Sequence, residues 1–506
     1  MGILVILEVL CYNILRFGKK REKGRETMAV LEELEPKKVF QIFEELSSVP
    51  RGTFYDEKVS NWCAEFARKR NLEYIQDEAG NVIIKKPGTL GYENSDPVII
   101  QGHMDMVCEK VEGSDHDFEN DPLELYIEDG YVKAKGTTLG GDDGIAIAYA
   151  FALLDSDDIP HPPLEVIVTT DEEIGMGGAN AIDMSQIKGN ILLNIDGEVE
   201  GVILAGCAGG VLETLKIPAQ REEKSGTVMT VQVKGLRGGH SGSQIHEQRG
   251  NANKILGRIL NHLDQETDIA LVSFKGGSKD NVIAGSSEAV IMAADPEKAQ
   301  GIVRNLAADI KAEFSSDEPD LQIPVTQEEG TEQALTKECT KKVIFALVCT
   351  PYGVQGLSRD LPGVVETSLN LGIVKTEEDS IALMYYLRSS VNSQMQELKS
   401  IFRTWAEMLG GTHEESGEYP AWMYQKDSKI RPLMAEAYKE VTGKDAEIST
   451  VHAGLECGLL SAKKPGLDCV SFGPDIPDVH SVNERLDIAS TERVWEMIKN
   501  VLAKLK

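Results

Sequence analysis

Short apolar runs alternate with helical segments at both ends of this chain, and this alternation constrains the fold more than any other feature. Apolar residues at helical spacing predict helices, and short apolar runs bounded by polar residues predict buried strands. Together they predict an α/β layer with a mostly parallel sheet and helices. The expected strands are 81–85, 97–101, 164–169, 191–195 and 469–472, and the expected helices are 31–49, 55–70, a segment after Gly144, and 433–441.

The middle of the chain has a different pattern. Residues 227–233 alternate between apolar and polar side chains, as a half-exposed strand does. A length of 506 residues is expected to hold two or three domains. We therefore expect an α+β domain at 213–415, inserted into a first domain whose two segments are 28–212 and 416–506. Further strands are expected at 270–274, 289–294 and 381–387, and further helices at 251–263 and 297–314.

The first 27 residues are expected to form an extension outside the fold. Residues 3–15 are mostly apolar, but Glu8 interrupts a run that is already too short to span a bilayer. A basic cluster follows this run, which is the reverse of the charge order in a signal peptide. We expect no stable membrane insertion, and a signal anchor is the alternative interpretation.

Charge and cysteine content narrow the class of protein. Lys and Arg total 52 and Asp and Glu total 82, which gives a net charge of −30. A surface this acidic repels phosphate backbones, so we expect no nucleic-acid partner. The 8 cysteines are scattered and form no CxxC pair. They predict neither a zinc–thiolate site nor a disulfide framework, and a reducing cytoplasm fits them best.

Polar clusters follow several of the expected strands. Because ligands bind at the carboxyl ends of strands in open α/β sheets, one pocket could collect all of them. Each cluster alone is weak evidence, since a single His or an acidic turn is more often structural or exposed. The clusters are Gly102–Asp105, Gly140–Gly144, Asp171–Gly175, Asn194–Gly197 and Asp478–Ser481.

Taken together, the clusters match the needs of a site for two zinc ions. Such a site requires a shared carboxylate, a few further nitrogen and oxygen ligands, and room for water. Three carboxylates against two Zn²⁺ leave one net positive charge, which can hold a hydroxide at neutral pH. The candidate ligands are His103, Asp142, Glu173, Asp196 and His480.

Two acidic residues beside these ligands, Asp105 and Glu172, are expected to support them. Asp105 lies two residues after His103, so on a strand it points the same way and can accept the second imidazole N–H. Glu172 and Glu173 are adjacent and cannot easily be equivalent ligands. The natural division is one metal ligand and one proton shuttle.

These segments resemble the co-catalytic zinc peptidases, the superfamily of carnosinase and aminoacylase. Within it, the chain is similar to the aminoacyl-histidine (Xaa-His) dipeptidases, also called cytosolic non-specific dipeptidases. The likeness extends over nearly all of 28–506. The segments that carry it are His103–Asp105, Leu139–Gly144, Thr170–Gly175, Asn194–Glu198, His480, Tyr419–Trp422 and His452–Glu456.

The resemblance implies a role for each metal ligand. Asp142 would bridge the two metals. His103 and Asp196 would complete one site, and Glu173 and His480 the other. A cis peptide after the bridging residue is common in the family, which suggests one at Asp142–Asp143. The family often has Asn where this chain has Asp143, a departure that should matter little.

The resemblance also implies the remaining catalytic and substrate-binding roles. Glu172 would be the general base and acid, and Asp105 would support His103. Residues 238–242 match the motif of the inserted domain whose His, here His240, polarises the scissile carbonyl. From the residues alone, His240 could also be merely a loop residue, and Arg388 could be a surface charge. The positions that match substrate-end contacts are Asn281, Arg388 and Gly454.

The expected protein is therefore a cytoplasmic zinc metallopeptidase that hydrolyses dipeptides, with the inserted domain as a lid. Mn²⁺ or Co²⁺ could replace zinc, small peptides are the expected partners, and a homodimer is possible. One alternative is an N-acyl amino acid deacylase or desuccinylase that uses the same site. Another is a catalytically silent metal-binding scaffold, against which the shuttle Glu172 argues.

Overall fold

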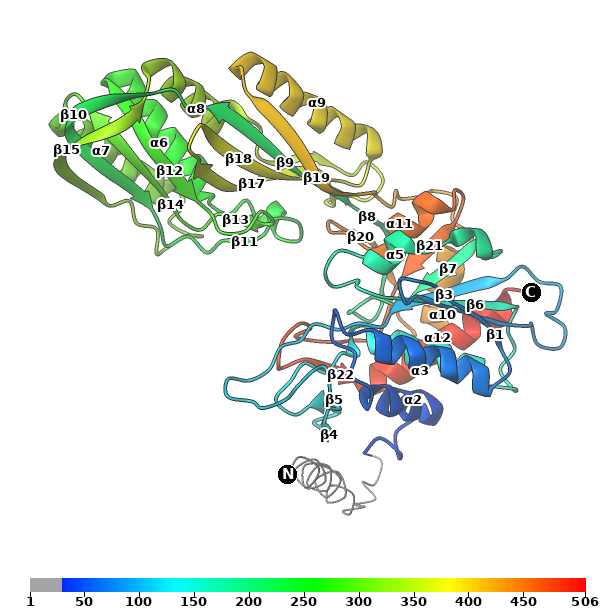
Figure 1. The fold of residues 1–506 in the computed structure, drawn as a ribbon. Helices are drawn as coiled ribbons and strands as arrows, with labels where there is room; N and C mark the ends of the chain where they lie inside the picture. The colour runs from blue at the N-terminus through cyan, green and yellow to red at the C-terminus, as the bar shows by residue number, and fades with distance from the viewer. Residues whose placement is uncertain (1–29) are drawn as a thin grey trace, which may run out of the picture.

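The computed structural model describes residues 30–506 and contains two large sheets (Figure 1). The expected extension at residues 1–27 lies outside the described residues. One sheet has eight strands, and it takes them from residues 73–207 and 447–471. The other takes all of its strands from the stretch 209–419.

The eight-stranded sheet is mixed, with its parallel strands at the centre. Its order is β1-β2-β6-β3-β7-β21-β8-β20. Strands β6, β3, β7 and β21 pair in parallel, whereas β1, β2 and β6 pair antiparallel. The strands are β1 (Glu73–Gln76), β2 (Val82–Lys86), β3 (Val98–His103), β6 (Leu164–Thr169), β7 (Ile191–Asn194), β8 (Val202–Cys207), β20 (Glu447–Val451) and β21 (Asp468–Ser471).

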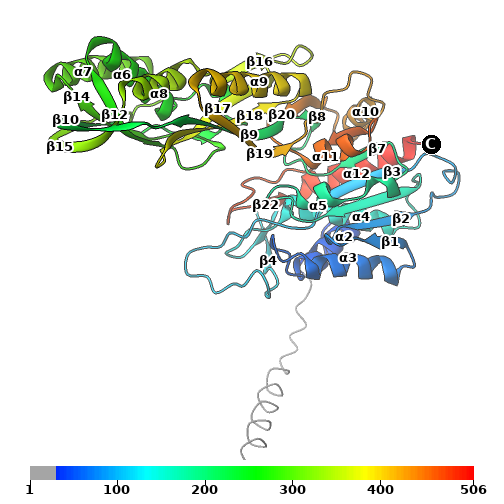
Figure 2. The same ribbon diagram turned by 45° about the horizontal axis from the view of Figure 1, so that its top comes forward.

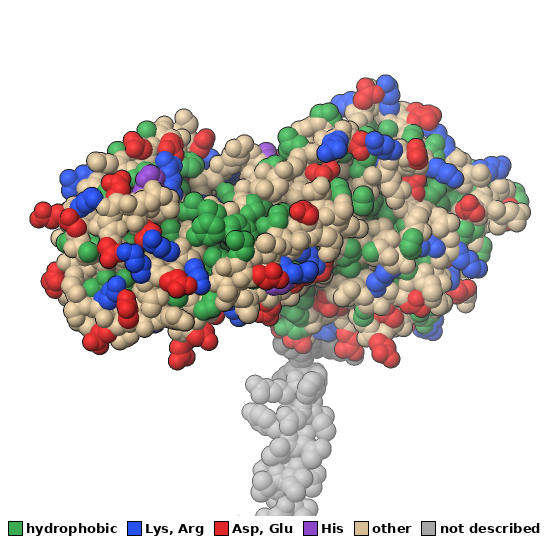
Figure 3. Space-filling view, turned by 90° about the horizontal axis from the view of Figure 1, so that it is seen from above, with side chains coloured by type: hydrophobic (Ala, Val, Ile, Leu, Met, Phe, Trp, Pro, Cys, Tyr) green, Lys and Arg blue, Asp and Glu red, His purple; other side chains and the backbone are tan. Residues whose placement is uncertain are grey.

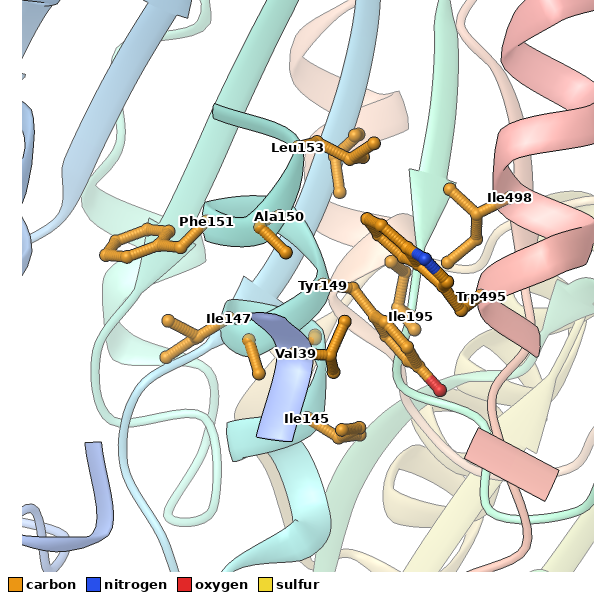
Figure 4. Close-up of a cluster of buried hydrophobic side chains, with 14 of the residues drawn as sticks. Val39, Ile145, Ile147, Tyr149, Ala150, Phe151, Leu153, Ile195, Trp495 and Ile498 are labelled. Atoms are coloured by element: carbon orange, nitrogen blue, oxygen red, sulfur yellow. The ribbon is translucent and has the colours of Figure 1, made fainter. Parts of the chain in front are cut away.

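Helices cover both faces of this sheet because its central strands are apolar on both sides. On β3, Val98 and Ile100 belong to one core cluster and Ile99 to the other. Figure 4 shows part of the larger cluster, around α4, where the rings of Tyr149 and Trp495 stack at 6.0 Å. The helices of this cluster are α2 (Lys37–Ser47), α3 (Glu57–Lys69), α4 (Gly141–Leu154), α10 (Ile430–Thr442) and α12 (Ile488–Lys504), and those of the other are α5 (Gly177–Ala181) and α11 (Glu456–Lys463).

The second sheet has nine strands, all paired antiparallel, in the order β15-β10-β14-β12-β17-β18-β9-β19 with β16 on β17. Helices lie along one of its faces, as Figure 2 shows. The strands are β9 (Gly209–Pro218), β10 (Arg221–Val233), β12 (Ile269–Gly276), β14 (Ser287–Ala293), β15 (Val325–Leu335), β16 (Gly353–Leu357), β17 (Val365–Thr376), β18 (Ser380–Ser389) and β19 (Thr412–Tyr419). The helices are α6 (Ala252–Glu266), α7 (Pro296–Glu313), α8 (Lys337–Cys349) and α9 (Asn392–Leu409).

Smaller elements complete the fold. A two-stranded sheet joins β11 (Gly239–His240) to β13 (Val282–Ile283). A three-stranded sheet contains β4 (Leu125–Glu128), β5 (Tyr131–Ala134) and β22 (Arg485–Asp487). Two short 3₁₀ helices are η1 (Met184–Gln186) and η2 (Ile245–Glu247). The chain passes from the eight-stranded to the nine-stranded sheet between β8 and β9, and it returns after β19. An isolated β-bridge between Cys207 and Trp422 connects these two segments.

The sequence predicted the buried elements well and the polar ones less well. Strand β6 has the expected bounds, but the first helix begins at Lys37 and not at Leu31. Pro36 precedes it at the N-cap. Proline has no backbone N–H, so it is tolerated at the start of a helix but not in its interior. Strand β15 was not predicted, since its exposed residues are charged or polar. Among residues 30–506, no helix is long and apolar enough to cross a membrane.

Candidate active site

The carboxyl ends of the central parallel strands carry the candidate ligands. On β3, Ile99, Gln101 and His103 point to the same face, because alternate residues of a strand do so. Along this face, the apolar Ile99 comes first, the polar Gln101 second and the candidate ligand His103 last. His103 and its backbone partner Thr169 are both buried at the ends of β3 and β6. The strand direction therefore delivers the ligands to one edge of the sheet.

Asp142 lies between the two candidate histidines. Its Oδ1 is 3.1 Å from Nε2 of His103, and its Oδ2 is 3.1 Å from Nε2 of His480. Asp142 is the second residue of α4, where the helix is kinked, and a cis peptide joins it to Asp143, which confirms that expectation. One carboxylate thus faces two imidazoles, each through a different oxygen, as a bridging ligand requires.

Asp196 and Glu173 extend this arrangement into two groups. His103, Asp142 and Asp196 each offer a ligand atom within 4.8 Å of one another. Asp142, Glu173 and His480 do the same, so Asp142 belongs to both groups. The structure therefore brings together all five residues expected to be ligands, in the two sets that the family resemblance implied. Glu172 lies beside them, in a group with His103 and Glu173.

The donor set fits divalent metal ions. Two imidazoles and three carboxylates suit zinc and similar cations. Oε1 of Glu173 is buried without a hydrogen-bond partner, and such an oxygen needs a cation or a donor. No lysine or arginine among residues 30–506 makes an ion pair with any of these five side chains. The acidic surplus of the site is therefore not neutralised by the protein's own basic side chains.

Burial and mutual contacts shift the pKa values of these side chains. Burial raises the pKa of Glu172 to about 8, with the Glu456 and Glu173 carboxylates acting in the same direction and His103 opposing them. Hydrogen bonds to Asp142 and Glu173 raise the pKa of His480 to about 11. Glu172 can therefore hold a proton near neutral pH, which is what a general acid and base needs.

Asp105 supports two parts of the site at once. Its Oδ1 is 3.3 Å from Nδ1 of His103, which leaves Nε2 of that ring to face Asp142. Its two oxygens also accept the backbone N–H groups of Glu172 and Glu173, at 3.0 and 3.3 Å. Thr53 donates a further hydrogen bond at 3.0 Å. The residue expected to fix one imidazole thus also holds the loop that carries both glutamates.

His240, which was expected to polarise the carbonyl, and the expected substrate-binding residues lie in a second cluster. His240 is on β11, and the Nδ1 atom of its ring accepts the N–H of Ser243 at 3.1 Å. Arg388 is buried and donates to the Tyr419 hydroxyl at 2.9 Å. No hydrogen bond or ion pair within 30–506 joins His240 to the two ligand groups. Within residues 30–506, the structure therefore shows no polar bond between His240 and the candidate ligands.

Gly454 and Asn281 flank this second cluster. A Cβ at Gly454 would lie 2.7 Å from the Tyr419 ring, so the chain can pass there only as glycine. The backbone carbonyl of Asn281 accepts the N–H of Ser241, next to His240. His452, the first residue of the segment His452–Glu456, is 8% exposed and its Nε2 lies 2.7 Å from the Ser368 hydroxyl. Burial lowers the pKa of His452 to about 3, so its ring is neutral.

Comparisons with known proteins now identify the family. Residues 99–504 match the peptidase family M20/M25/M40. A relative from Escherichia coli (strain K12), named Cytosol non-specific dipeptidase, is 36% identical over 482 residues, which cover 94% of this chain and 99% of the relative. The chain belongs to the peptidase family M20/M25/M40. This confirms the resemblance seen in the motifs, and with it the expectation of a peptide hydrolase.

Solved structures agree with this assignment to family M20. The aminoacylhistidine dipeptidase from Vibrio alginolyticus matches with a TM-score of 0.88 and 37% identity, covering 94% of this chain and 98% of that one. The aminopeptidase PepT from Bacillus cereus matches with a TM-score of 0.54 and 17% identity over 93% of this chain and 99% of that one. The second likeness shows the fold alone. The expected α/β class with a second α+β region is confirmed, and the sheet that was expected to be mostly parallel is mixed, with parallel strands at its centre.

Two buried carboxylates around the ligands, those of Asp143 and Glu456, were given no role in the sequence analysis. Asp143 is 1% exposed and accepts the backbone N–H of His103 at 3.2 Å. Glu456 is fully buried and accepts hydrogen bonds from Gln101 on β3 and Thr169 on β6. Burial raises the pKa of Glu456 to about 7. The signal available in the sequence was an acidic residue inside an apolar segment, which indicates a buried partner.

A further histidine and carboxylate group lies in the nine-stranded sheet. Glu213, His413 and Glu415 each offer a ligand atom within 4.8 Å of the others. His413 Nδ1 is 3.0 Å from Oε1 of Glu213. Lys399, on α9, reaches Glu415 at 2.6 Å and Glu418 at 2.9 Å. The protein thus supplies its own cation to this group.

Proposed function

We propose that this family M20 chain is a zinc-dependent dipeptidase with preference for Xaa-His peptides and broad specificity. The observation that carries the proposal is the pair of three-residue ligand groups that share Asp142. Two metal ions held there would polarise a scissile carbonyl and lower the pKa of a water molecule, so that a nucleophilic hydroxide is available at neutral pH. The named relatives, a cytosol non-specific dipeptidase and an aminoacylhistidine dipeptidase, support the choice of substrate.

The chain's own residues would move the proton. Glu172 is placed beside the ligands by the backbone bonds to Asp105. Its carboxylate would accept a proton from the attacking water and donate it to the leaving amine. Burial raises its pKa to about 8, which suits both halves of this transfer. Glu173 would remain a ligand, because its Oε2 already lies 3.1 Å from His480.

We also propose that the region 213–415 acts as a lid. His240 and Arg388 lie in the second cluster, away from the ligand groups, so a closing movement would bring them to the bound peptide. His240 would then polarise the carbonyl, and Arg388, Asn281 and Gly454 would hold the substrate ends. Burial and the nearby Arg388 charge lower the pKa of His240, which leaves its ring neutral and able to donate from Nε2.

A second candidate activity is the removal of an acyl or succinyl group from an amino acid. The ligand set determines hydrolysis of an amide bond and leaves open which side chains are bound. Arg388 favours a substrate with a carboxylate, which both classes have. A scaffold that only binds metal is less well supported, because Glu172 and its raised pKa would have no purpose beside a complete ligand set.

Metal removal and a substrate panel test the proposal. The purified full-length chain should bind about two zinc ions and lose its activity on chelation. Zinc, manganese or cobalt should restore activity. With metal present, dipeptides should be hydrolysed faster than tripeptides and N-acyl amino acids. Full activity in the metal-free protein would sink the proposal, and faster hydrolysis of N-acyl amino acids would favour the deacylase.

Location and assembly remain predictions. The printed name of the Escherichia coli relative and the seven free cysteines among residues 30–506 support a cytoplasmic protein. The expected homodimer would need an exposed apolar surface. Figure 3 shows hydrophobic side chains grouped on the face seen there, and Phe345, Val348 and Met408 on α8 and α9 are exposed. Sedimentation of the wild type and of Met408→Glu would test whether two copies pack there.

A further inference from the structure

Glu484 holds the loop that carries the bridging aspartate. Its side chain is buried, and the residue is 3% exposed. Oε2 accepts the backbone N–H groups of Leu139 and Gly140, at 2.8 and 3.0 Å. Oε1 accepts those of Gly141 and Asp142, at 2.7 and 3.3 Å. One carboxylate therefore binds four successive N–H groups, and the last of them belongs to Asp142 itself.

These N–H groups would otherwise have no partner. They precede or begin α4, and the first N–H groups of a helix cannot bond within it. The N-cap residue of α4 is Gly140, which has no side chain to supply a cap. Glu484 takes the place of that cap from 345 positions away in the chain, counted from Leu139. A negative charge at a helix N-terminus is also favoured by the helix dipole.

Arg51 holds the same loop from its carbonyl side. It is 2% exposed, and its Nη2 donates to the carbonyl of Gly140 while Nη1 donates to that of Met104 at 3.3 Å. Gly140 has a φ of +65°, and a Cβ there would lie 2.5 Å from Nη2 of Arg51. The loop is thus fixed through its N–H groups by an anion and through a carbonyl by a cation. Only glycine fits between them.

We propose that Glu484 is a positioning residue that sets the carboxylate of Asp142 between the two halves of the metal site. Glu484 lies four residues after the ligand His480, so one short segment carries both a ligand and the clamp on the bridging residue. The segment that carries His480 is therefore joined to Asp142 in two ways, by the contact between their side chains and by the hydrogen bond from the Asp142 N–H to Glu484. This inference rests on the proposed two-metal function.

Glu165 provides a matched control. It is also a buried carboxylate, 3% exposed, and it accepts the backbone N–H groups of Lys188 and Gly189 at 2.9 and 2.8 Å. It lies on β6, four residues before Thr169, and so at the opposite end of the strand from the ligands. Glu165→Gln removes the same kind of interaction from the same sheet without touching the metal site.

The experiment compares Glu484→Gln with Glu165→Gln in the full-length chain. Glutamine keeps the shape of the side chain, but its NH₂ group cannot accept hydrogen bonds from the two backbone N–H groups that it would face. Zinc and cobalt binding would be measured by competition titration and by the visible spectrum of the cobalt protein, alongside kcat, KM and the melting temperature of the metal-free protein. Glu484→Asp, which retains the charge with a shorter reach, is the conservative variant.

We expect Glu484→Gln to weaken metal binding by about 10–100-fold, as loss of groups that orient ligands typically does. The cobalt spectrum should change, kcat should fall and KM should change little. Glu484→Asp should recover part of the loss. Glu165→Gln should lower the melting temperature of the metal-free protein but leave metal affinity and spectrum as in the wild type.

Two outcomes would overturn the role of Glu484. One is wild-type metal affinity and spectrum in Glu484→Gln. The other is an equal loss of metal binding in Glu165→Gln, since both variants would then act only through folding. If Glu484→Gln does not fold, Glu484→Asp decides between them by the same measurements. A wild-type protein that binds no divalent ion would instead overturn the proposed function, and this inference with it.

Discussion

Two groups of histidine and carboxylate side chains in this protein have similar geometry and different surroundings. At the end of β3, His103 and His480 face three carboxylates with no basic side chain paired to them. On β9 and β19, His413 faces Glu213 and Glu415, but Lys399 pairs with Glu415 at 2.6 Å. In both groups, each three-residue set has its ligand atoms within 4.8 Å of one another. Distance alone therefore does not separate them.

Charge balance separates the two groups. A cluster of carboxylates repels itself unless a cation lies among them. In the nine-stranded sheet, Lys399 is that cation, and a metal ion would have to displace it. At the edge of the eight-stranded sheet, no lysine or arginine of the described chain pairs with the carboxylates, and the imidazoles that face them are the candidate ligands themselves. We therefore expect metal binding at the first group only, and the following variants test this difference.

Glu172→Gln should have the largest effect. Glutamine retains the shape of the side chain but cannot accept a proton, so kcat should fall by about 10²–10⁴-fold, as on loss of a general acid and base. KM should change little, because the base acts in the chemical step. Metal content should stay at the wild-type level, as measured by elemental analysis, and added zinc should not restore activity. Full activity in this variant would place the chemistry elsewhere.

Glu173→Gln should have a smaller, reversible effect. It replaces a charged ligand with a neutral, weaker one, so one of the two metals should be lost first and activity with it. Excess zinc should restore part of kcat, as a titration of activity against free zinc would show. If Glu173→Gln retains its metal and Glu172→Gln loses it, the two roles are reversed.

His413→Ala should leave metal content and kcat close to those of the wild type, because Lys399 already neutralises its group. His480→Ala is the matched control at the first group and should lose metal. Elemental analysis of both variants after dialysis makes the measurement. Loss of metal from His413→Ala would show a metal site in the nine-stranded sheet and remove the distinction drawn between the groups.

Glu213→Gln should have the smallest effect, visible only in the pH dependence of stability. Burial raises the pKa of Glu213 from 4.5 to about 8, with Glu415 acting in the same direction and Lys399 opposing. The folded state therefore favours the protonated form. That contribution is present below the unfolded pKa and is lost as pH rises through about 8.

The melting temperature of the wild type should thus fall more steeply between about pH 5 and 9 than that of Glu213→Gln. Parallel curves for the two proteins would contradict the raised pKa. The metal content should be the same in both, which separates this effect from the first group.

The ligand residues could be predicted because each follows a buried strand or begins a helix. His103 and Asp196 are polar residues at the end of apolar runs, so they stand out in the sequence. The carboxyl ends of parallel strands meet at one edge of the sheet, which predicts that such residues lie together. Strands β2, β3, β6, β7 and β21 of the eight-stranded sheet were predicted for the same reason, since burial on both faces gives continuous apolar runs, whereas β1, β8 and β20 were not predicted. Strand β15 escaped prediction because its side chains face solvent and carry no such period.

The sequence by itself determined the elements of the α/β layer, the order of the motifs and the kinds of ligand atom available. Only the tertiary structure decided which charges meet. Glu484 and Arg51 show no local pattern, and their partners at 139–142 lie far away in the chain. The physical reason is that hydrophobic burial is periodic and local, whereas compensation of a buried charge depends on whichever group the fold brings within a few ångströms.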